Sequence, residues 1–235
     1  MARIGFIGTG EIAAAMVDTI AGDGHQITVS RRGEAASSRL AEAHPGLQVA
    51  EKLAVVDDSD IVVLCLLADR AREVLPGLRF RPDQTVISVM ARMGIAEIAQ
   101  LCGPVTDICL AIPLPPMPLG GTPLAAFPDN PRLRDLFGPH AQIHACRTEQ
   151  EIAAHFGVSG LLLPLLDQID TSATWLAGYT GDHAGAVRYI AGLIGGTEGG
   201  LNQTLSKALK GTGTHEALEN GLDGLRKGLG LPEVS

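Results

Sequence analysis

Apolar and polar positions follow two alternating patterns along the first half of the chain. Short apolar runs, such as those at 3–7 and 60–67, each precede a stretch with helical spacing, such as 11–20. Near-continuous apolar runs are typical of parallel strands, because helices cover such a sheet on both faces. The sequence therefore predicts an α/β fold over residues 1–147, with a Rossmann-type doubly wound parallel sheet.

The remaining runs complete this predicted domain. Further strands are expected at 25–30, 48–50, 85–89, 106–112 and 124–127, and further helices at 35–43, 52–57, 70–75, 95–101 and 131–137. The proline-rich segment 113–118 is expected to be a rigid, extended loop. Proline cannot continue a helix, and it lacks the N–H that a central strand needs.

From about residue 148 the pattern changes to helices alone, expected at 149–177, 182–209 and 214–229 with interruptions at Pro164 and several glycines. The runs LLLPLL and AGLIGG in this region are apolar and rich in small residues. So short a region would leave apolar surface bare in a monomer. We therefore expect residues 148–235 to form a small all-helical dimerisation domain in a homodimer or higher homo-oligomer.

Composition narrows the possible partners. The net charge of −8 argues against binding to nucleic acid or to anionic membranes. No stretch is expected to reach the uncharged length of a membrane-spanning helix, and no secretory leader is recognised, so a cytoplasmic protein is expected. The four cysteines have no CxxC spacing, which favours free thiols over a disulfide or a metal site.

The start of the chain carries the first candidate for chemistry. The spacing Gly8-x-Gly10-x-x-Ala13 follows an apolar strand and opens a helix. In dinucleotide-binding sites the first glycine permits a tight turn, the second lets the backbone approach a pyrophosphate, and the third small residue lets helix and strand pack closely. The helix N-terminus then offers free N–H groups to the phosphates.

The end of the second strand predicts which dinucleotide is bound. An NAD-preferring site would place an acidic residue about 20 positions beyond the glycines, against the ribose hydroxyls. This chain has Ser30, Arg31 and Arg32 there instead. Guanidinium groups suit a 2′-phosphate through charge-assisted hydrogen bonds, so NADP(H) is the predicted cofactor. The alternative is that the two arginines only solvate a loop.

Over nearly its whole length the chain resembles the pyrroline-5-carboxylate reductases. The resemblance rests on GFIGTGEIAAAMV at 5–17, DIVVLCLLADRAREVL at 60–75, VISVMARMGIAEI at 86–98 and KGTGTHEALENGLDGLRKGL at 210–229. The third stretch has two more residues than the V-I-S-x-A-A-G-I of the family. The family's M-P-N-T-P loop reads IPLPP here, and its K-P after the third strand is Leu67-Ala68.

This resemblance implies an NADPH-dependent reductase that transfers hydride to the C=N bond of a small cyclic imine, as in proline biosynthesis. It makes Thr214 the candidate partner of the substrate's ring nitrogen, although Thr214 equally suits a helix N-cap ahead of Glu216. Together with the fingerprint it predicts a set of cofactor contacts: Gly8, Thr9, Gly10, Glu11, Ile12, Ser30, Arg31, Arg32, Leu66 and Leu67.

Two other functions are compatible with the same residues. The apolar segment 112–119 lacks the polar groups expected around a carboxylated imine. An NADP oxidoreductase acting on another imine, a carbonyl or a deazaflavin is one alternative, as in the similar F420-dependent NADP reductases. A non-catalytic NADP-binding protein is the other.

Overall fold

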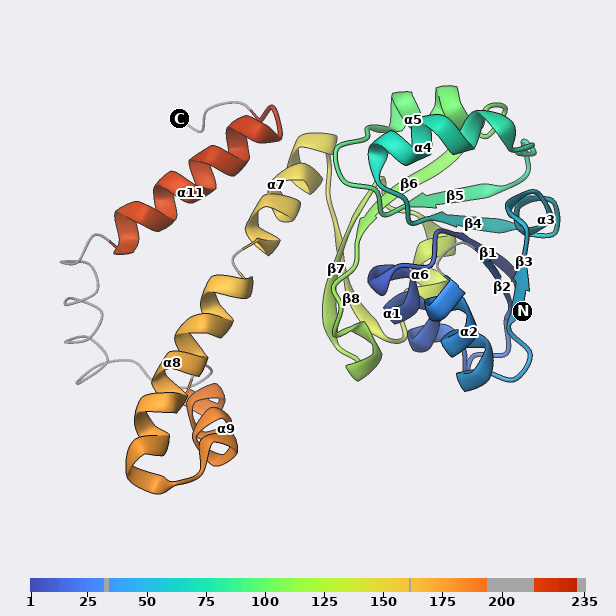
Figure 1. Ribbon diagram of the computed structural model, residues 1–235. Helices are drawn as coiled ribbons and strands as arrows, with labels where there is room; N and C mark the ends of the chain where they lie inside the picture. Colours follow the sequence, from blue (N-terminus) through green and yellow to red (C-terminus); the bar gives the residue numbers. More distant parts are fainter. Residues whose placement is uncertain (32–33, 161, 194–213, 232–235) are drawn as a thin grey trace. The chain divides into compact units, whose positions relative to one another are not determined.

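The computed structural model describes residues 1–31, 34–160, 162–193 and 214–231 (Figure 1). The chain divides into two compact units, Met1–Ile152 and Ala153–Ser235. Each unit is described by itself below. The cofactor and substrate roles predicted for the two parts of the chain stay predictions.

Unit 1 contains an eight-stranded sheet in the order β3-β2-β1-β4-β5-β6-β7-β8. The strands are β1 (Arg3–Ile7), β2 (Gln26–Ser30), β3 (Gln48–Ala50), β4 (Ile61–Leu64), β5 (Thr85–Ser88), β6 (Asp107–Ile112), β7 (Thr122–Phe127) and β8 (Ala141–Ala145). The first six have the strand order of a dinucleotide-binding Rossmann sheet, and they pair in parallel. The predicted α/β fold class is confirmed.

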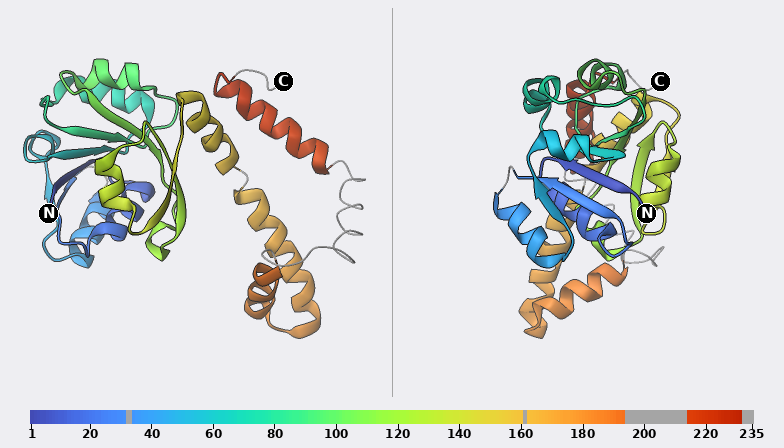
Figure 2. Two further views of the ribbon diagram at one scale, coloured as in Figure 1. Left: turned by 180° about the vertical axis from the view of Figure 1, so that it is seen from behind. Right: turned by 90° about the vertical axis from the view of Figure 1, so that its right-hand side faces the viewer.

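Helices cover both faces of the sheet (Figure 2). The helices are α1 (Glu11–Ile20), α2 (Glu34–Ala43), α3 (Lys52–Asp57), α4 (Ala68–Val74), α5 (Ile95–Cys102), α6 (Pro131–Phe137) and the start of α7 (Glu149–Ser159). One core joins α1, α2 and α6 to the sheet, and a second core joins α3, α4 and α5 to the opposite face. Successive residues of β4 enter the two cores in turn, which explains its continuous apolar run.

The sheet departs from the predicted parallel arrangement at β7, which runs antiparallel to β6. The connection between them is residues 113–121, and its one helical element is the 3-10 turn η2 (Met117–Leu119). A parallel return needs a crossover of a dozen or more residues, usually with an α-helix. This connection is too short for such a crossover, so the chain turns back beside β6.

Two predicted segments differ in their details. The segment 113–118 was expected to be extended throughout, but it ends in η2, where Pro118 stands within the first turn and its missing N–H costs nothing. The expected strand 60–67 ends already at Leu64. Cys65, Leu66 and Leu67 therefore belong to a loop at the carboxyl end of β4.

Unit 2 contains the rest of α7 together with α8 (Leu162–Thr180), α9 (His183–Leu193) and α11 (Thr214–Gly228). Helices α8 and α9 form a hairpin around Gly181, and Asp182 accepts a hydrogen bond from the Gly185 N–H at 2.8 Å. Ala173 and Ala186 are buried. Residues 194–209 of the predicted second helix lie outside the described residues. The predicted dimerisation role stays a prediction.

The helical stretch Glu149–Thr180, of which residue 161 lies outside the described residues, is long and apolar enough to cross a membrane, judged by length and composition alone. The sequence-based expectation that no stretch reaches such a length is therefore wrong. A core helix of a soluble protein passes the same test, so the stretch is weak support for a membrane span.

Asn130 offers a test of how β6 is tied to α6. Its side-chain oxygen accepts a hydrogen bond from the Leu133 N–H at 3.1 Å, and its amide nitrogen donates to Asp107 at 2.8 Å. We expect Asn130→Ala to lower the free energy of unfolding by about 1–2 kcal/mol, since it removes the helix cap. Urea denaturation measures this. Arg132→Ala, an exposed change on the same helix, should stay within about 0.5 kcal/mol of the parent, and equal losses in both variants would contradict the prediction.

Candidate functional site

The glycine turn after β1 lies against the loop that follows β4. Gly8 has a φ of 98°, and a Cβ at this position would lie 2.4 Å from the carbonyl oxygen of Cys65. Both facts demand glycine, because other residues rarely adopt this φ and no larger residue fits. The turn is thereby placed where β1 and β4, neighbours in the sheet, lead to opposite halves of the fold. In open α/β sheets, ligands bind at such a switch point.

The conformation and packing of Gly10, unlike those of Gly8, do not require a glycine. Its φ of −80° and ψ of −172° suit any residue, and a Cβ there would meet no atom within 4 Å. Nothing in the described part of the protein therefore requires glycine at this position. An open space beside a glycine backbone is what a closely approaching ligand needs.

The first turn of α1 starts directly at this space. No side chain in the described residues caps the helix, and the first intrahelical bond runs from the Ala14 N–H to the Gly10 carbonyl at 2.9 Å. The preceding N–H groups, those of Glu11, Ile12 and Ala13, have no acceptor within the helix. Together with the positive end of the helix dipole, they form a surface that favours an anion.

Two predicted contact residues, Thr9 and Ser30, lie beneath the turn. Ser30 is fully buried, and its Oγ accepts a hydrogen bond from the Gly8 N–H at 2.9 Å. Thr9 is also buried, and its hydroxyl donates to the Ser30 carbonyl oxygen at 3.4 Å. Both side chains therefore fix the turn to the end of β2. Their hydroxyl groups are directed into the protein.

Arg31 is the first residue after β2 and is exposed. Its Nε donates to Oε1 of Glu51 at 3.1 Å, and Glu51 follows directly after β3. The two terminal nitrogens of the guanidinium have no partner among the described residues and stay available to a ligand. Glu51 was not identified from the sequence, although its place at the carboxyl end of a parallel strand was a usable signal. Arg32 lies outside the described residues.

The loop after β4 brings Leu66 to the turn, since its Cδ2 lies 3.1 Å from the Cβ position of Gly8. Leu67 beside it is 79% exposed. Burial raises the pKa of the neighbouring Cys65 thiol far above its ordinary value, so this thiol stays protonated at neutral pH.

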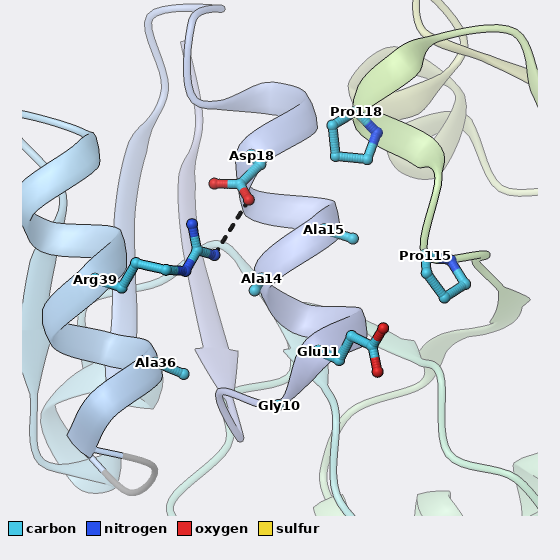
Figure 3. A pocket seen from close by; sticks show the side chains of 9 residues that line it. All are labelled: Gly10, Glu11, Ala14, Ala15, Asp18, Ala36, Arg39, Pro115 and Pro118. Carbon is cyan, nitrogen blue, oxygen red and sulfur yellow. Dashed lines mark hydrogen bonds and ion pairs between the residues drawn. The ribbon is translucent and has the colours of Figure 1, made fainter. Parts of the chain in front are cut away.

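A pocket of ≈ 340 Å³ runs along the outer side of α1 from the glycine turn (Figure 3). It is lined by Gly10, Glu11, Ala14, Ala15, Asp18, Ala36, Arg39, Pro115 and Pro118. Arg39 closes one side through an ion pair with Asp18 at 3.2 Å, and Glu11 extends toward Pro115 on the other. From the sequence, these two prolines were expected to form part of an extended loop, and their place in the wall of a pocket was not predicted.

Thr214, the predicted catalytic residue, is the first residue of α11 in unit 2. Its side chain lies outside what the structure describes, as does the segment 194–213 that precedes it. Within the described ranges, no group of three or more His, Cys, Asp or Glu side chains is arranged to hold a metal ion.

Comparisons with known proteins agree with this architecture. Residues 3–92 match the family model described as NADP oxidoreductase coenzyme F420-dependent. No curated protein sequence matches the chain.

Solved structures match over nearly the whole chain. The 1-pyrroline-5-carboxylate reductase of Streptococcus pyogenes has a TM-score of 0.79 at 17% identity, covering 97% of this chain and 98% of that one. The pyrroline carboxylate reductase of Plasmodium falciparum, solved with NADP bound, has a TM-score of 0.77 at 15% identity, covering 97% of both chains. A reductive aminase from Aspergillus terreus has a TM-score of 0.58 at 16% identity, covering 99% of this chain and 88% of that one. The resemblance predicted from the sequence is therefore confirmed for the fold, which this chain shares with the pyrroline-5-carboxylate reductases.

Proposed function

We propose that this protein is an NADPH-dependent oxidoreductase that reduces the C=N bond of a small cyclic imine, as pyrroline-5-carboxylate reductases do. The observation that carries the proposal is the open space at Gly10, next to an uncapped helix N-terminus. Gly10 has no reason within the described residues to lack a side chain, and a dinucleotide pyrophosphate fits there.

In this proposal, two sets of groups in the chain bind different parts of NADPH. The N–H groups at the start of α1 bind the pyrophosphate, while the free nitrogens of Arg31 bind the 2′-phosphate. Glu51 is a positioning residue here, since it holds Nε and so orients the guanidinium. When bound, NADPH supplies the hydride.

Hydride transfer to an imine requires little from protein side chains, beyond holding the cofactor and substrate in the right geometry and excluding water. The loops 65–67 and 113–116 are apolar and suit a site that excludes water. Thr214 is the proposed partner of the substrate: its hydroxyl oxygen accepts a hydrogen bond from the protonated ring nitrogen and so orients the C=N bond. A second copy of the chain, paired through the helical unit, is part of this proposal, as is a role in proline formation.

A deazaflavin acceptor is the second candidate. It is favoured by the match of residues 3–92 to the F420-dependent family model and by the loop 113–116, which has no polar side chain to recognise a carboxylated imine.

Loss of NADPH absorbance separates the candidates when the purified protein is supplied with pyrroline-5-carboxylate, a neutral imine, a carbonyl compound or F420 in turn. Turnover of an imine supports the proposal. Turnover of F420 alone replaces it with the second candidate. Tight NADPH binding without any turnover indicates a non-catalytic NADP-binding protein.

Arg31→Ala tests the choice of cofactor. The lost charge-assisted bond to the 2′-phosphate should weaken NADPH binding about 10- to 100-fold, while NADH binding should not change. Calorimetry measures both constants. Arg3→Ala is the matched control, since Arg3 is paired with Asp60 at the amino end of β1. This variant should leave the ratio of the NADPH and NADH dissociation constants unaltered. An unchanged dissociation constant for NADPH in Arg31→Ala would contradict the proposed binding of the 2′-phosphate by Arg31.

The two glycines of the turn should respond differently to alanine. Gly10→Ala adds a methyl group to open space, so the melting temperature should not change. The same methyl group would occupy the space proposed for the pyrophosphate, so NADPH binding should weaken by about tenfold or more. Gly8→Ala places a Cβ against the Cys65 carbonyl at a positive φ and should destabilise the fold by about 1–3 kcal/mol or more. Thermal denaturation and NADPH titration measure the pair. An NADPH affinity equal to that of the parent in Gly10→Ala would contradict the proposed pyrophosphate site.

A further inference from the structure

The strand β8 forms one of the two edges of the sheet in unit 1 (Figure 1). Among the described strands its one neighbour is β7, and the two pair in parallel in a continuous register over all five residues of β8. β8 reads AQIHA, so it contains no proline, no lysine, no arginine, no carboxylate and no bulge. Such features usually close an edge strand to another chain. The side chains of Gln142, His144 and Ala145 are exposed, which leaves β8 open to a further strand.

The backbone groups of β8 divide between β7 and the free edge of the sheet. The Cys146 N–H donates to the Ala126 carbonyl oxygen at 2.8 Å, so the residue that follows β8 still faces β7. Backbone N–H and C=O groups point alternately to the two sides of a strand, and Gln142 and His144 therefore face β7 as well. The groups of the other three residues point to the free edge, namely those of Ala141, Ile143 and Ala145. Each of these three residues offers one donor and one acceptor to a further strand.

The sequence of β8 is complementary to itself when a second copy runs antiparallel beside it. A twofold axis at Ile143 sets Ala141 opposite Ala145 of the partner subunit and Ile143 opposite its own counterpart. These are the residues with outward backbone groups, so each pair exchanges two hydrogen bonds. Moving the partner strand by two residues leaves Ala141 or Ala145 without a counterpart in β8. The axis at Ile143 is therefore the register that uses all the outward groups.

The side chains agree with the same register. It places Gln142 opposite His144 of the partner subunit, in the pairs without backbone hydrogen bonds, where side chains lie closest. An amide and an imidazole each carry a donor and an acceptor, so these two side chains can hydrogen-bond to each other. The remaining pairs are alanine with alanine and isoleucine with isoleucine. No position of the strand meets an unsuitable neighbour.

We propose that β8 is an interface between two copies of this chain, which pair antiparallel about Ile143 and join their sheets edge to edge. The partner is a second copy rather than an unrelated peptide, because a twofold interface requires the same self-complementary segment on both sides. This contact is separate from the pairing through the helical unit and does not depend on the proposed reductase activity. A pairing of five residues buries little surface, so the association should vary with protein concentration.

Ala145→Pro tests the pairing at the backbone. Proline is tolerated in an edge strand where the missing N–H faces outward, so the melting temperature should stay within a few degrees of the parent. The twofold axis removes two intermolecular hydrogen bonds at once, so the dissociation constant of the contact should rise about tenfold or more. Sedimentation equilibrium over a range of concentrations measures it. Ala145→Ser is the matched control, because it keeps the N–H and should associate like the parent.

Cysteine cross-linking tests the register without a proline. In the double variant Gln142→Cys with His144→Cys, each new thiol lies opposite its counterpart at about 4.5–5.5 Å between Cβ atoms, close to the reach of a disulfide. Oxidised glutathione should convert this variant into a covalent dimer on a non-reducing gel. Gln142→Cys alone is the control, because its two copies lie on a diagonal of about 7–8 Å. The natural cysteines are free thiols present in both variants, so the control also accounts for them.

The outcomes decide on the interface whatever the activity of the protein. A covalent dimer in the double variant alone, with weaker association in Ala145→Pro, supports the proposal. Equal cross-linking of the single and double variants would overturn the register, and absence of cross-linking in both would overturn the interface. Association of the parent that persists unchanged in Ala145→Pro would assign it to another surface and overturn the proposal too. If the parent shows no measurable association, the cross-linking result decides by itself.

Discussion

The close approach of the Gly8 turn to the backbone of Cys65 is the constraint on which the candidate site depends. It joins the ends of β1 and β4 where the two halves of the sheet diverge, and it directs α1 away from that junction. The Ser30 hydroxyl secures the same turn from below by accepting the Gly8 N–H. Because these contacts are buried, they fix the backbone of the turn and with it the start of α1.

Most of unit 1 could be predicted from periodicity. The strand Gln48–Ala50 and the helices Lys52–Asp57 and Pro131–Phe137 have the bounds that the sequence indicated. These elements combine a clear apolar pattern with proline or charged residues at their ends. The antiparallel return of β7 was not predicted, because strand direction depends on the length and path of the connection. An apolar run looks the same in either direction.

The candidate site could be predicted in outline only. The glycine spacing and the position of Arg31 followed from the sequence, because they depend on local order along the chain. Other features depend on which segments the sheet brings together, such as the pairing of Glu51 with Arg31 and the burial of the Ser30 hydroxyl. The backbone of Arg92 is a third kind of case. It lies in the loop between β5 and α5 with a φ of 66°, between the buried Met90 and Met93, and no propensity of arginine indicates this conformation.

The short β3 has a consequence for how the protein meets other chains. It is an edge strand of only three residues, and the charged residues Glu51 and Lys52 follow it at once. Few backbone groups are left there for an incoming strand, and pairing would strip water from two charges. This margin is therefore protected against intermolecular strand addition, one of the usual routes to aggregation.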